Sequence, residues 1–424
     1  MSISEKQKKI LAFPYSKFDS IICDGSVRSG KTSLMTVSFI DWAMENFSNQ
    51  RFGLCGKTVD SCTKNLVIPY ISMAYAKKKY NMRWLRSDKL LEVRRGFTTN
   101  YFEVFGGKDE SSFMLIQGRT LAGVLMDEVA LMPESFVNQA LARCSVDGAK
   151  LWFSCNPDNP NHWFYKDWIK RHRERNALYL HFAMTDNPSL SDKTLARYES
   201  MYSGVFYQRY IQGLWVAAEG LVYQDFANNA EKYLIDDPME WCSENNTRFT
   251  TIMIGVDFGG TGSATKFQAT GITPRGVVVA LDEEYIKGEV DPDALNREYS
   301  TFCKAITGKY GNAQTRADSA EQILIRGLFH TAQRENLGTQ VKNALKMPIN
   351  DRIMLTLLLM KQGRLFVSRS CPHLIEAFQT AVYDSKKFED VRLDDGTTDI
   401  DSLDAFEYSI EPWYKQLEQY GFKR

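Results

Sequence analysis

The 424-residue sequence contains no long hydrophobic run and no low-complexity tract. A membrane-spanning helix needs about 20 mainly apolar residues, and no run approaching that length occurs, so we expect no membrane segment. The opening residues, MSISEKQKKI, are too polar for the apolar core of a signal peptide. We therefore expect a protein of the cytoplasm. Its 44% of hydrophobic residues is typical of a folded globular chain.

Cysteine and histidine are also scarce, at 8 and 5 residues, and form neither a CxxC pair nor a Cys/His spacing that binds zinc. Cys144 and Cys155 are the nearest pair with any pattern, and no further ligand accompanies them. The sequence therefore gives no support for a disulfide framework or a thiolate metal site. We expect reduced thiols in a core.

Net charge is zero, but its distribution is uneven. Residues 1–230 carry 29 Lys and Arg against 23 Asp and Glu, whereas residues 231–424 carry 23 against 29. The first half is thus +6 and the second −6. A basic half suits a polyanionic partner, and an ordinary solvated surface explains this modest excess equally well.

The length predicts more than one domain, and we expect two. In the first 220 residues, short β-rich runs alternate with helical patterns, which is typical of a parallel α/β sheet. The expected strands there are SIICDG, FGLCGK, FMLIQG, GVLMDE and LWFSCNP. A polar connector follows, and a second α/β pattern then begins with TTIMIGVDFGG. The expected domains are 1–225 and 248–424, with a linker at 226–247.

The strongest motif is GSVRSGKT, which follows an apolar strand and opens a predicted helix. It fits the GxxxxGK[ST] pattern of a P-loop, whose backbone N–H groups and helix N-terminus hold phosphate. Lys31 is expected to reach the β- and γ-phosphates of ATP, and Thr32 to ligate Mg²⁺. The predicted nucleotide-binding residues are Gly25, Ser26, Val27, Arg28, Ser29, Gly30, Lys31, Thr32 and Asp127. Because switches and kinases share such loops, the loop alone names no reaction.

A second motif narrows the reaction to ATP hydrolysis. An apolar strand at Gly123–Met126 ends in Asp127 and Glu128, about 95 residues after the P-loop. Asp127 is expected in the Mg²⁺ shell, and Glu128 is expected to orient or deprotonate the attacking water. The alternative is a pair of acids that caps a helix. Following a P-loop, the pair favours a Walker B element.

Other polar residues near these motifs have two interpretations each. Ser154 and Asn156 end the strand LWFSCNP, where they can sense the γ-phosphate and couple hydrolysis to a neighbouring domain. A simple Asn-Pro turn explains them equally well. Arg28, Arg119 and Arg143 are candidate arginine fingers, in cis or in trans, and the sequence does not choose among them.

The second half carries a separate set of acids. Asp257 ends a strand, Asp318 follows another, and Asp401 and Asp404 lie three residues apart, on one side of a predicted helix. Together they can hold two divalent cations for phosphodiester hydrolysis. Caps at strand ends and helix starts are an equal alternative. The glycines of VDFGGTG also suit the phosphate loop of an actin-like ATPase.

Taken in order, GSVRSGKT, VLMDEVALMPESFVNQALARCS, GAKLWFSCNPDNPNHWFY, GVDFGGTGSAT and DSLDAFEY resemble the large terminase subunit of tailed phages, the PBSX-type group in particular. The resemblance spans nearly the whole chain. It implies a DNA-packaging motor with two α/β domains, an ASCE-type P-loop ATPase followed by an RNase H-like nuclease that cuts concatemeric DNA with two Mg²⁺ or Mn²⁺ ions.

The resemblance also implies roles for individual residues. Asp127 and Glu128 would be the Walker B acid and the catalytic base, and Ser154–Pro157 would fall on the coupling motif. The implied nuclease metal ligands are Asp257, Asp318 and Asp404. Related proteins often have His where Asp401 stands, so Asp401 either supplements a metal or caps its helix. Gln7 is the candidate for the adenine-binding residue.

The partners that the resemblance implies are double-stranded DNA, a small terminase subunit and the portal of an empty procapsid. The chain would be a monomer in solution and a homo-oligomeric ring when packaging. It would act in the host cytoplasm and transiently at the portal, and would be absent from the mature virion. Two alternatives remain: a helicase or repair-type ATPase whose C-terminal domain binds DNA without cutting, and a nucleotide switch that scaffolds partners.

Overall fold

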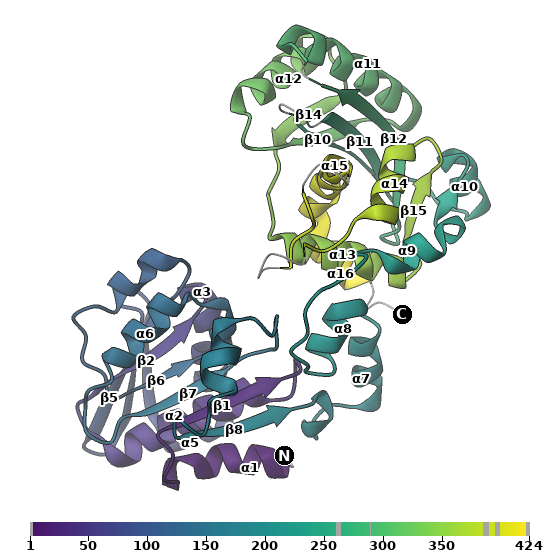
Figure 1. The fold of residues 1–424 in the computed structure, drawn as a ribbon. Helices are drawn as coiled ribbons and strands as arrows, with labels where there is room; N and C mark the ends of the chain where they lie inside the picture. The colour runs from purple at the N-terminus through teal and green to yellow at the C-terminus, as the bar shows by residue number, and fades with distance from the viewer. Residues whose placement is uncertain (1–2, 260–263, 289, 385–389, 395–398, 421–424) are drawn as a thin grey trace. The chain divides into compact units, whose positions relative to one another are not determined.

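The computed structural model describes residues 3–259, 264–288, 290–384, 390–394 and 399–420. The chain forms two compact units (Figure 1). Unit 1 comprises Met1–Glu199 with Gly204–Ala217, and unit 2 comprises Ser200–Ser203 with Ala218–Arg424. No helix among the described residues has both the length and the apolar composition to cross a bilayer.

Unit 1 is a mixed sheet flanked by helices. Its strands are β1 (Ser20–Gly25), β2 (Arg51–Gly56), β3 (Asn81–Leu85), β4 (Leu90–Arg95), β5 (Thr98–Gly106), β6 (Gly123–Met126), β7 (Lys150–Ser154) and β8 (Ala177–Phe182). Its helices are α1 (Glu5–Ala12), α2 (Lys31–Asn46), α3 (Val59–Cys62), α4 (Ile68–Ser72), α5 (Ala74–Lys79), α6 (Glu134–Ala142), α7 (Asp192–Glu199) and α8 (Gly204–Tyr210).

The strand order of unit 1 is β3-β4-β5-β2-β6-β7-β1-β8, and the run from β5 to β8 is parallel. β7 therefore lies between β1, which leads into the P-loop, and β6, which leads into Asp127. Residues of β1 alternate between two apolar clusters: Ile21 and Cys23 belong to one, and Ile22 to the other. The sheet is thus buried on both faces, which explains the continuous apolar runs.

One predicted strand is wrong. FMLIQG contributes to a 3-10 helix at Glu110–Leu115, whose turn is closed by hydrogen bonds between Asp109 and Ser112. Phe113, Met114 and Leu115 are exposed, and of the apolar residues in this run only Ile116 joins the core. The edge of the sheet is instead formed by β3, β4 and β5, which the sequence pattern did not indicate.

Unit 2 also has a central sheet. Its strands are β9 (Leu234–Ile235), β10 (Thr251–Asp257), β11 (Ala264–Ile272), β12 (Val278–Lys287), β13 (Ala313–Ala317), β14 (Thr339–Asn343) and β15 (Leu365–Ser368). Its helices are α9 (Gln224–Asn228), α10 (Pro238–Glu244), α11 (Pro292–Tyr310), α12 (Gln322–Arg334), α13 (Ile349–Lys361), α14 (Pro372–Thr380), α15 (Ile400–Ile410) and α16 (Tyr414–Tyr420).

The strand order of unit 2 is β14-β13-β10-β11-β12-β15-β9. β10, β11 and β12 form an antiparallel meander, and β13 and β14 run parallel to β10. This is the arrangement expected for an RNase H-like fold. Figure 1 shows α11 and α12 on one side of this sheet and α15 on the other.

A glycine on β10 sets how closely α15 approaches the sheet. A Cβ added to Gly255 would lie 1.7 Å from the carbonyl oxygen of Ala405 and 3.1 Å from the backbone nitrogen of Ser409. Both atoms are helix backbone, which cannot move aside cheaply. Gly255 therefore lets α15, which carries Asp401 and Asp404, pack directly on the strand that ends in Asp257.

The segment expected to be a linker, 226–247, contains β9 and α10. β9 pairs with β15 and so extends the sheet of unit 2. A two-residue strand is too short for sequence periodicity to reveal. The domain boundaries expected at residues 225 and 248 stay predictions. All eight cysteines are unpaired, and seven of them are buried.

Candidate nucleotide site and carboxylate cluster

The P-loop needs glycine at both of its turns. Gly25 has φ 122° and Gly30 has φ 81°, in the region that side chains other than glycine rarely adopt. A Cβ on Gly25 would also lie 1.9 Å from the carbonyl oxygen of Phe182 on β8. Gly30 is the N-cap of α2, so the loop delivers Lys31 and Thr32 to the first turn of that helix.

Lys31 points into the loop that precedes it. Its Nζ donates to the carbonyl oxygens of Gly25 and Ser26, at 3.0 and 2.8 Å. Ser29 Oγ and Asn156 Oδ1 each accept from the same ammonium at 3.3 Å. Burial lowers the pKa of Lys31. The contact with Asn156 brings together two residues that the sequence placed 125 positions apart.

Asp127 joins three elements around one carboxylate. Its Oδ1 accepts hydrogen bonds from Thr32 Oγ1 at 2.8 Å and from Ser154 Oγ at 2.7 Å. Its Oδ2 accepts one from Asn65 Nδ2 at 3.1 Å. Thr32, Asp127 and Ser154 therefore meet as the sequence predicted. Asn65 was not predicted, because nothing in its local sequence marks it.

These residues line a cavity of about 490 Å³. The cavity also includes Glu128, which has φ 57°, an uncommon backbone conformation for a residue other than glycine. Burial raises the pKa of the Glu128 carboxyl, and the neighbouring Asp127 raises it further, while Lys31 opposes both effects. Such strained residues cluster at functional sites.

The three candidate arginine fingers separate in the structure. Arg28 lines the cavity and its guanidinium lies 5.7 Å from the ring centre of Tyr198. Arg119 Nε pairs with Glu103 at 3.2 Å, and Arg119 and Arg143 are not among the residues that line this cavity. Gln7 is buried and donates through Nε2 to the carbonyl oxygen of Ser29, at 3.1 Å. It thus supports the back of the P-loop.

The four predicted nuclease acids gather at the carboxyl end of β10. Asp257 is 8% exposed. Burial raises the pKa of its carboxyl well above the usual range, and Asp404, Asp401 and Asp318 raise it further. Asp401 Oδ2 accepts a hydrogen bond from the backbone of Ala264 at 2.8 Å. The residues are therefore close enough to repel one another.

Cationic side chains hold two of these acids. Lys346 Nζ pairs with Asp318 Oδ1, and Arg352 Nη1 lies 3.0 Å from Asp404 Oδ1, where Arg392 Nη2 also donates. Among the described residues, no three His, Cys, Asp or Glu side chains are arranged to hold a metal ion. Their role as metal ligands therefore stays a prediction.

The sequence did not indicate the buried network behind Asp404. Arg392 forms a bidentate pair with Glu407, at 2.7 and 3.0 Å, and Arg352 Nη1 lies 3.1 Å from Glu407 Oε2. Glu407 also accepts from Tyr223 OH at 3.2 Å. Glu407 lies three residues after Asp404, one helical turn along α15, so this spacing was the available signal.

Comparison with solved structures identifies relatives of the whole chain. The structure resembles that of the large terminase from a thermophilic bacteriophage, with a TM-score of 0.82 and 36% sequence identity over 96% of this chain and 98% of that one. The chain belongs to the phage large terminase family. The same phage enzyme in complex with ADP is 35% identical with a TM-score of 0.80, covering 96% of this chain and 98% of that one. Its complex with ATP-gamma-S is 33% identical with a TM-score of 0.79, covering 96% and 99%.

A family model supports this assignment. "Terminase large subunit, T4likevirus-type, N-terminal" matches residues 22–229. The comparison with curated proteins gave no match. As a large terminase, the chain is an ATPase and a nuclease that packages and cuts phage DNA. This confirms the predicted fold class and function over the helicase and switch alternatives, whereas the PBSX-type assignment stays a prediction.

Proposed function

We propose that the cavity around Lys31 binds and hydrolyses ATP with Mg²⁺, and that the acids around Asp257 cut DNA with two divalent cations. The observation that carries the ATPase assignment is the position of Asp127 between Thr32 and Ser154, with Glu128 beside it. The large terminase of the thermophilic phage has been solved with ADP and with ATP-gamma-S, which supports the choice of nucleotide.

The residues of the cavity suit each part of the hydrolysis. Backbone N–H groups of the P-loop and the start of α2 bind the phosphates, and Lys31 exchanges its carbonyl partners for β- and γ-phosphate oxygens. Thr32 and Asp127 would hold Mg²⁺, which would neutralise charge on the phosphate oxygens. Glu128, which lines the same cavity beside Asp127, accepts the proton of the attacking water.

Ser154 and Asn156 connect this chemistry to the rest of unit 1. Asn156 Oδ1 contacts Lys31 and Ser154 Oγ contacts Asp127, so both ends of the phosphate site bear on the end of β7. A shift of either partner on hydrolysis changes these hydrogen bonds. We assign the coupling role to this pair, and Arg28, which lines the cavity, is our preferred finger among the three arginines.

The donor set of the acid cluster fits hard divalent cations. Asp318, Asp401 and Asp404 lie close enough to Asp257 to raise its pKa, and oxygen ligands are those that Mg²⁺ and Mn²⁺ prefer. Their mutual repulsion is the cost that a bound cation removes. Asp257, Asp318 and Asp404 would hold the metals, and Asp401, tied to the backbone of Ala264, would supplement them. Bound metals supply Lewis-acid activation of water and of the scissile phosphate.

The proposed partners follow from family membership. They are double-stranded DNA, a terminase small subunit and the portal of a procapsid, with a homo-oligomeric ring assembling from monomers at the portal in the host cytoplasm. Zero net charge favours weak DNA binding by the isolated chain, and a ring would multiply that affinity.

Electron paramagnetic resonance with Mn²⁺ tests the acid cluster directly. Without nucleotide, the full chain should bind two Mn²⁺ ions, and Asp257→Asn should lose at least one of them. Asp282→Asn, a half-buried acid on β12 outside the cluster, is the matched control and should bind two. Equal binding by wild type and Asp257→Asn would overturn the assignment. For the cavity, Lys31→Ala should abolish binding of a fluorescent ATP analogue.

A further inference from the structure

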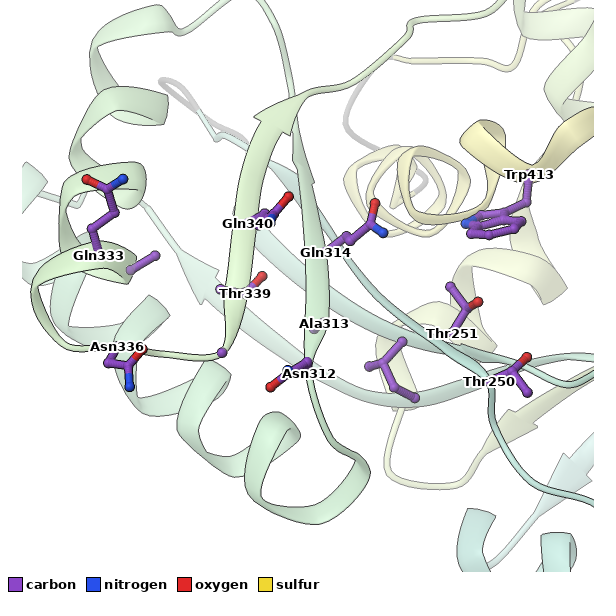
Figure 2. Close-up of a pocket in the computed structure, with 13 residues that line it drawn as sticks. Thr250, Thr251, Asn312, Ala313, Gln314, Gln333, Asn336, Thr339, Gln340 and Trp413 are labelled. Carbon is purple, nitrogen blue, oxygen red and sulfur yellow. The ribbon is translucent and has the colours of Figure 1, made fainter.

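A second cavity lies at the opposite end of the strands that carry the nuclease acids. It has a volume of about 780 Å³ and lies at the amino ends of β10, β13 and β14. Figure 2 shows Gln314 and Gln340 on neighbouring strands, Gln333 and Asn336 towards one end and Trp413 at the other.

The lining of this cavity is polar but uncharged. Five of its side chains are amides and three are threonines, and none of the described residues that line it carries a charge. No hydrogen bond joins the amide groups to another described residue; the five are Asn312, Gln314, Gln333, Asn336 and Gln340. The amides of Asn65 and Asn100, by contrast, are hydrogen-bonded. Each of the five cavity amides therefore presents to the cavity an N–H donor and a carbonyl acceptor that no described residue occupies.

This chemistry selects a class of ligand. A phosphate, a carboxylate or a metal ion needs compensating charge, which the lining lacks. An amide presents a donor and an acceptor side by side, which matches the edge of a nucleobase, and a Trp ring provides a surface on which a base stacks. The lining therefore fits the neutral, flat and polar part of a nucleotide.

The sheet face between the cavity and the acids suits a DNA backbone. Gln314 pairs in register with Gln340, and two residues further along Arg316 pairs with Lys342. The alternate residues Ala313, Thr315 and Ala317 are buried, and Thr315 contacts Tyr299 of α11. Because side chains alternate along a strand, the side chains of the two pairs, Gln314 with Gln340 and Arg316 with Lys342, project from the face opposite α11. Arg316 also has a buried Nε without a hydrogen-bond partner.

We propose that this cavity holds an unpaired nucleobase of the DNA strand that the acid cluster cuts, while Arg316 and Lys342 contact the backbone between them. The inference rests on the proposed nuclease function. From Thr251 to Asp257 is six strand residues, or about 20 Å at about 3.3 Å per residue. At the rise of double-helical DNA, about 3.4 Å per nucleotide, this distance spans about six stacked nucleotides between the base and the scissile phosphate.

Fluorescence anisotropy of a labelled duplex with a ten-nucleotide single-stranded tail tests the proposal. The full chain is used without divalent metal, so that no strand is cut. Trp413→Leu, which removes the stacking surface, should bind the tailed DNA about tenfold more weakly. Gln314→Ala with Gln340→Ala, which removes the contacts to the base edge, should weaken binding by about the same factor. Binding of the blunt duplex should be unchanged. Gln379→Ala, an exposed amide on α14, is the matched control and should bind as wild type does.

Abasic nucleotides placed at successive tail positions supply the second arm. An abasic nucleotide at one of these positions should weaken DNA binding by wild type as much as the double substitution of Gln314 and Gln340 does. In the double variant, the same abasic nucleotide should cause no further loss of binding. The proposal is overturned if the variants bind tailed DNA like wild type, if tailed and blunt DNA are lost equally, or if the abasic effect persists undiminished. Failure of the nuclease assignment appears separately, as cutting by Asp257→Asn in Mn²⁺.

Discussion

Replacing Arg392 with glutamine tests how much the buried ion pair behind Asp404 stabilises unit 2. The Arg392 and Glu407 side chains are 2% and 1% exposed and meet through two hydrogen bonds. Removing one partner of a buried pair costs about 3–5 kcal/mol, because the remaining charge stays out of water. Arg352 still contacts Glu407, so we expect the lower end of this range, about 3 kcal/mol.

Differential scanning calorimetry of the full chain measures this loss. For a unit of about 200 residues, 1 kcal/mol corresponds to about 2–4 °C, so Tm should fall by about 6–12 °C. Arg334→Gln, an exposed arginine in α12, should stay within about 0.5 kcal/mol of wild type. Changing both Arg392 and Glu407 to methionine removes the buried anion too, and should cost less than Arg392→Gln alone. A loss for Arg392→Gln no larger than that for Arg334→Gln would refute the reasoning.

Three further predictions concern single side chains. Glu128→Gln should keep ATP binding and lower kcat by about 100- to 10,000-fold, and unchanged phosphate release would reassign the base. Hydrogen bonds from Lys304, Ser300 and Arg334 lower the pKa of Glu335 from 4.5 to about 2. The stabilisation that the Glu335 carboxylate provides is therefore complete above pH 4.5 and disappears as the pH falls towards 2. Urea titrations should find Glu335→Gln less stable than wild type at pH 7, and this difference in stability should shrink in acid. A difference in stability that does not change with pH would exclude this linkage. Gly255→Ala should prevent folding, because the added Cβ would meet the backbone of α15. Gly308→Ala, in open space within α11, is the control and should raise the free energy of unfolding by about 0.5–1 kcal/mol in the same titrations. A soluble Gly255→Ala protein with the stability of wild type would contradict this packing.

The sequence predicted features whose signal is local. The P-loop is a contiguous motif, and its glycines meet a backbone requirement that the structure bears out at Gly25 and Gly30. Asp127 follows the apolar strand β6 of unit 1, and Asp257 ends the apolar strand β10 of unit 2. Within each unit, the carboxyl edge of the sheet is where ligand-binding residues gather. The spacing of the motif residues and the apolar runs of the strands were sufficient to predict these positions.

The missed features depend on contacts between distant segments. Arg352, Arg392 and Glu407 come from three separate parts of the chain and meet in the folded unit 2. Asn65 reaches Asp127 from the π-helical turn Thr63–Val67. FMLIQG is apolar enough for a strand, but the sheet positions beside β2 were already taken by β5 and β6. Tertiary competition of this kind leaves no local pattern.

Two assays on the same protein preparations test most directly that one chain carries two separate sites. ATP hydrolysis and cutting of a supercoiled plasmid in Mn²⁺ are measured for wild type, Lys31→Ala and Asp257→Asn. Lys31→Ala should lose hydrolysis and still cut the plasmid, whereas Asp257→Asn should hydrolyse ATP and leave the plasmid intact. Plasmid cutting by Asp257→Asn at the wild-type rate, or ATP hydrolysis by Lys31→Ala at the wild-type rate, would contradict the two-site account.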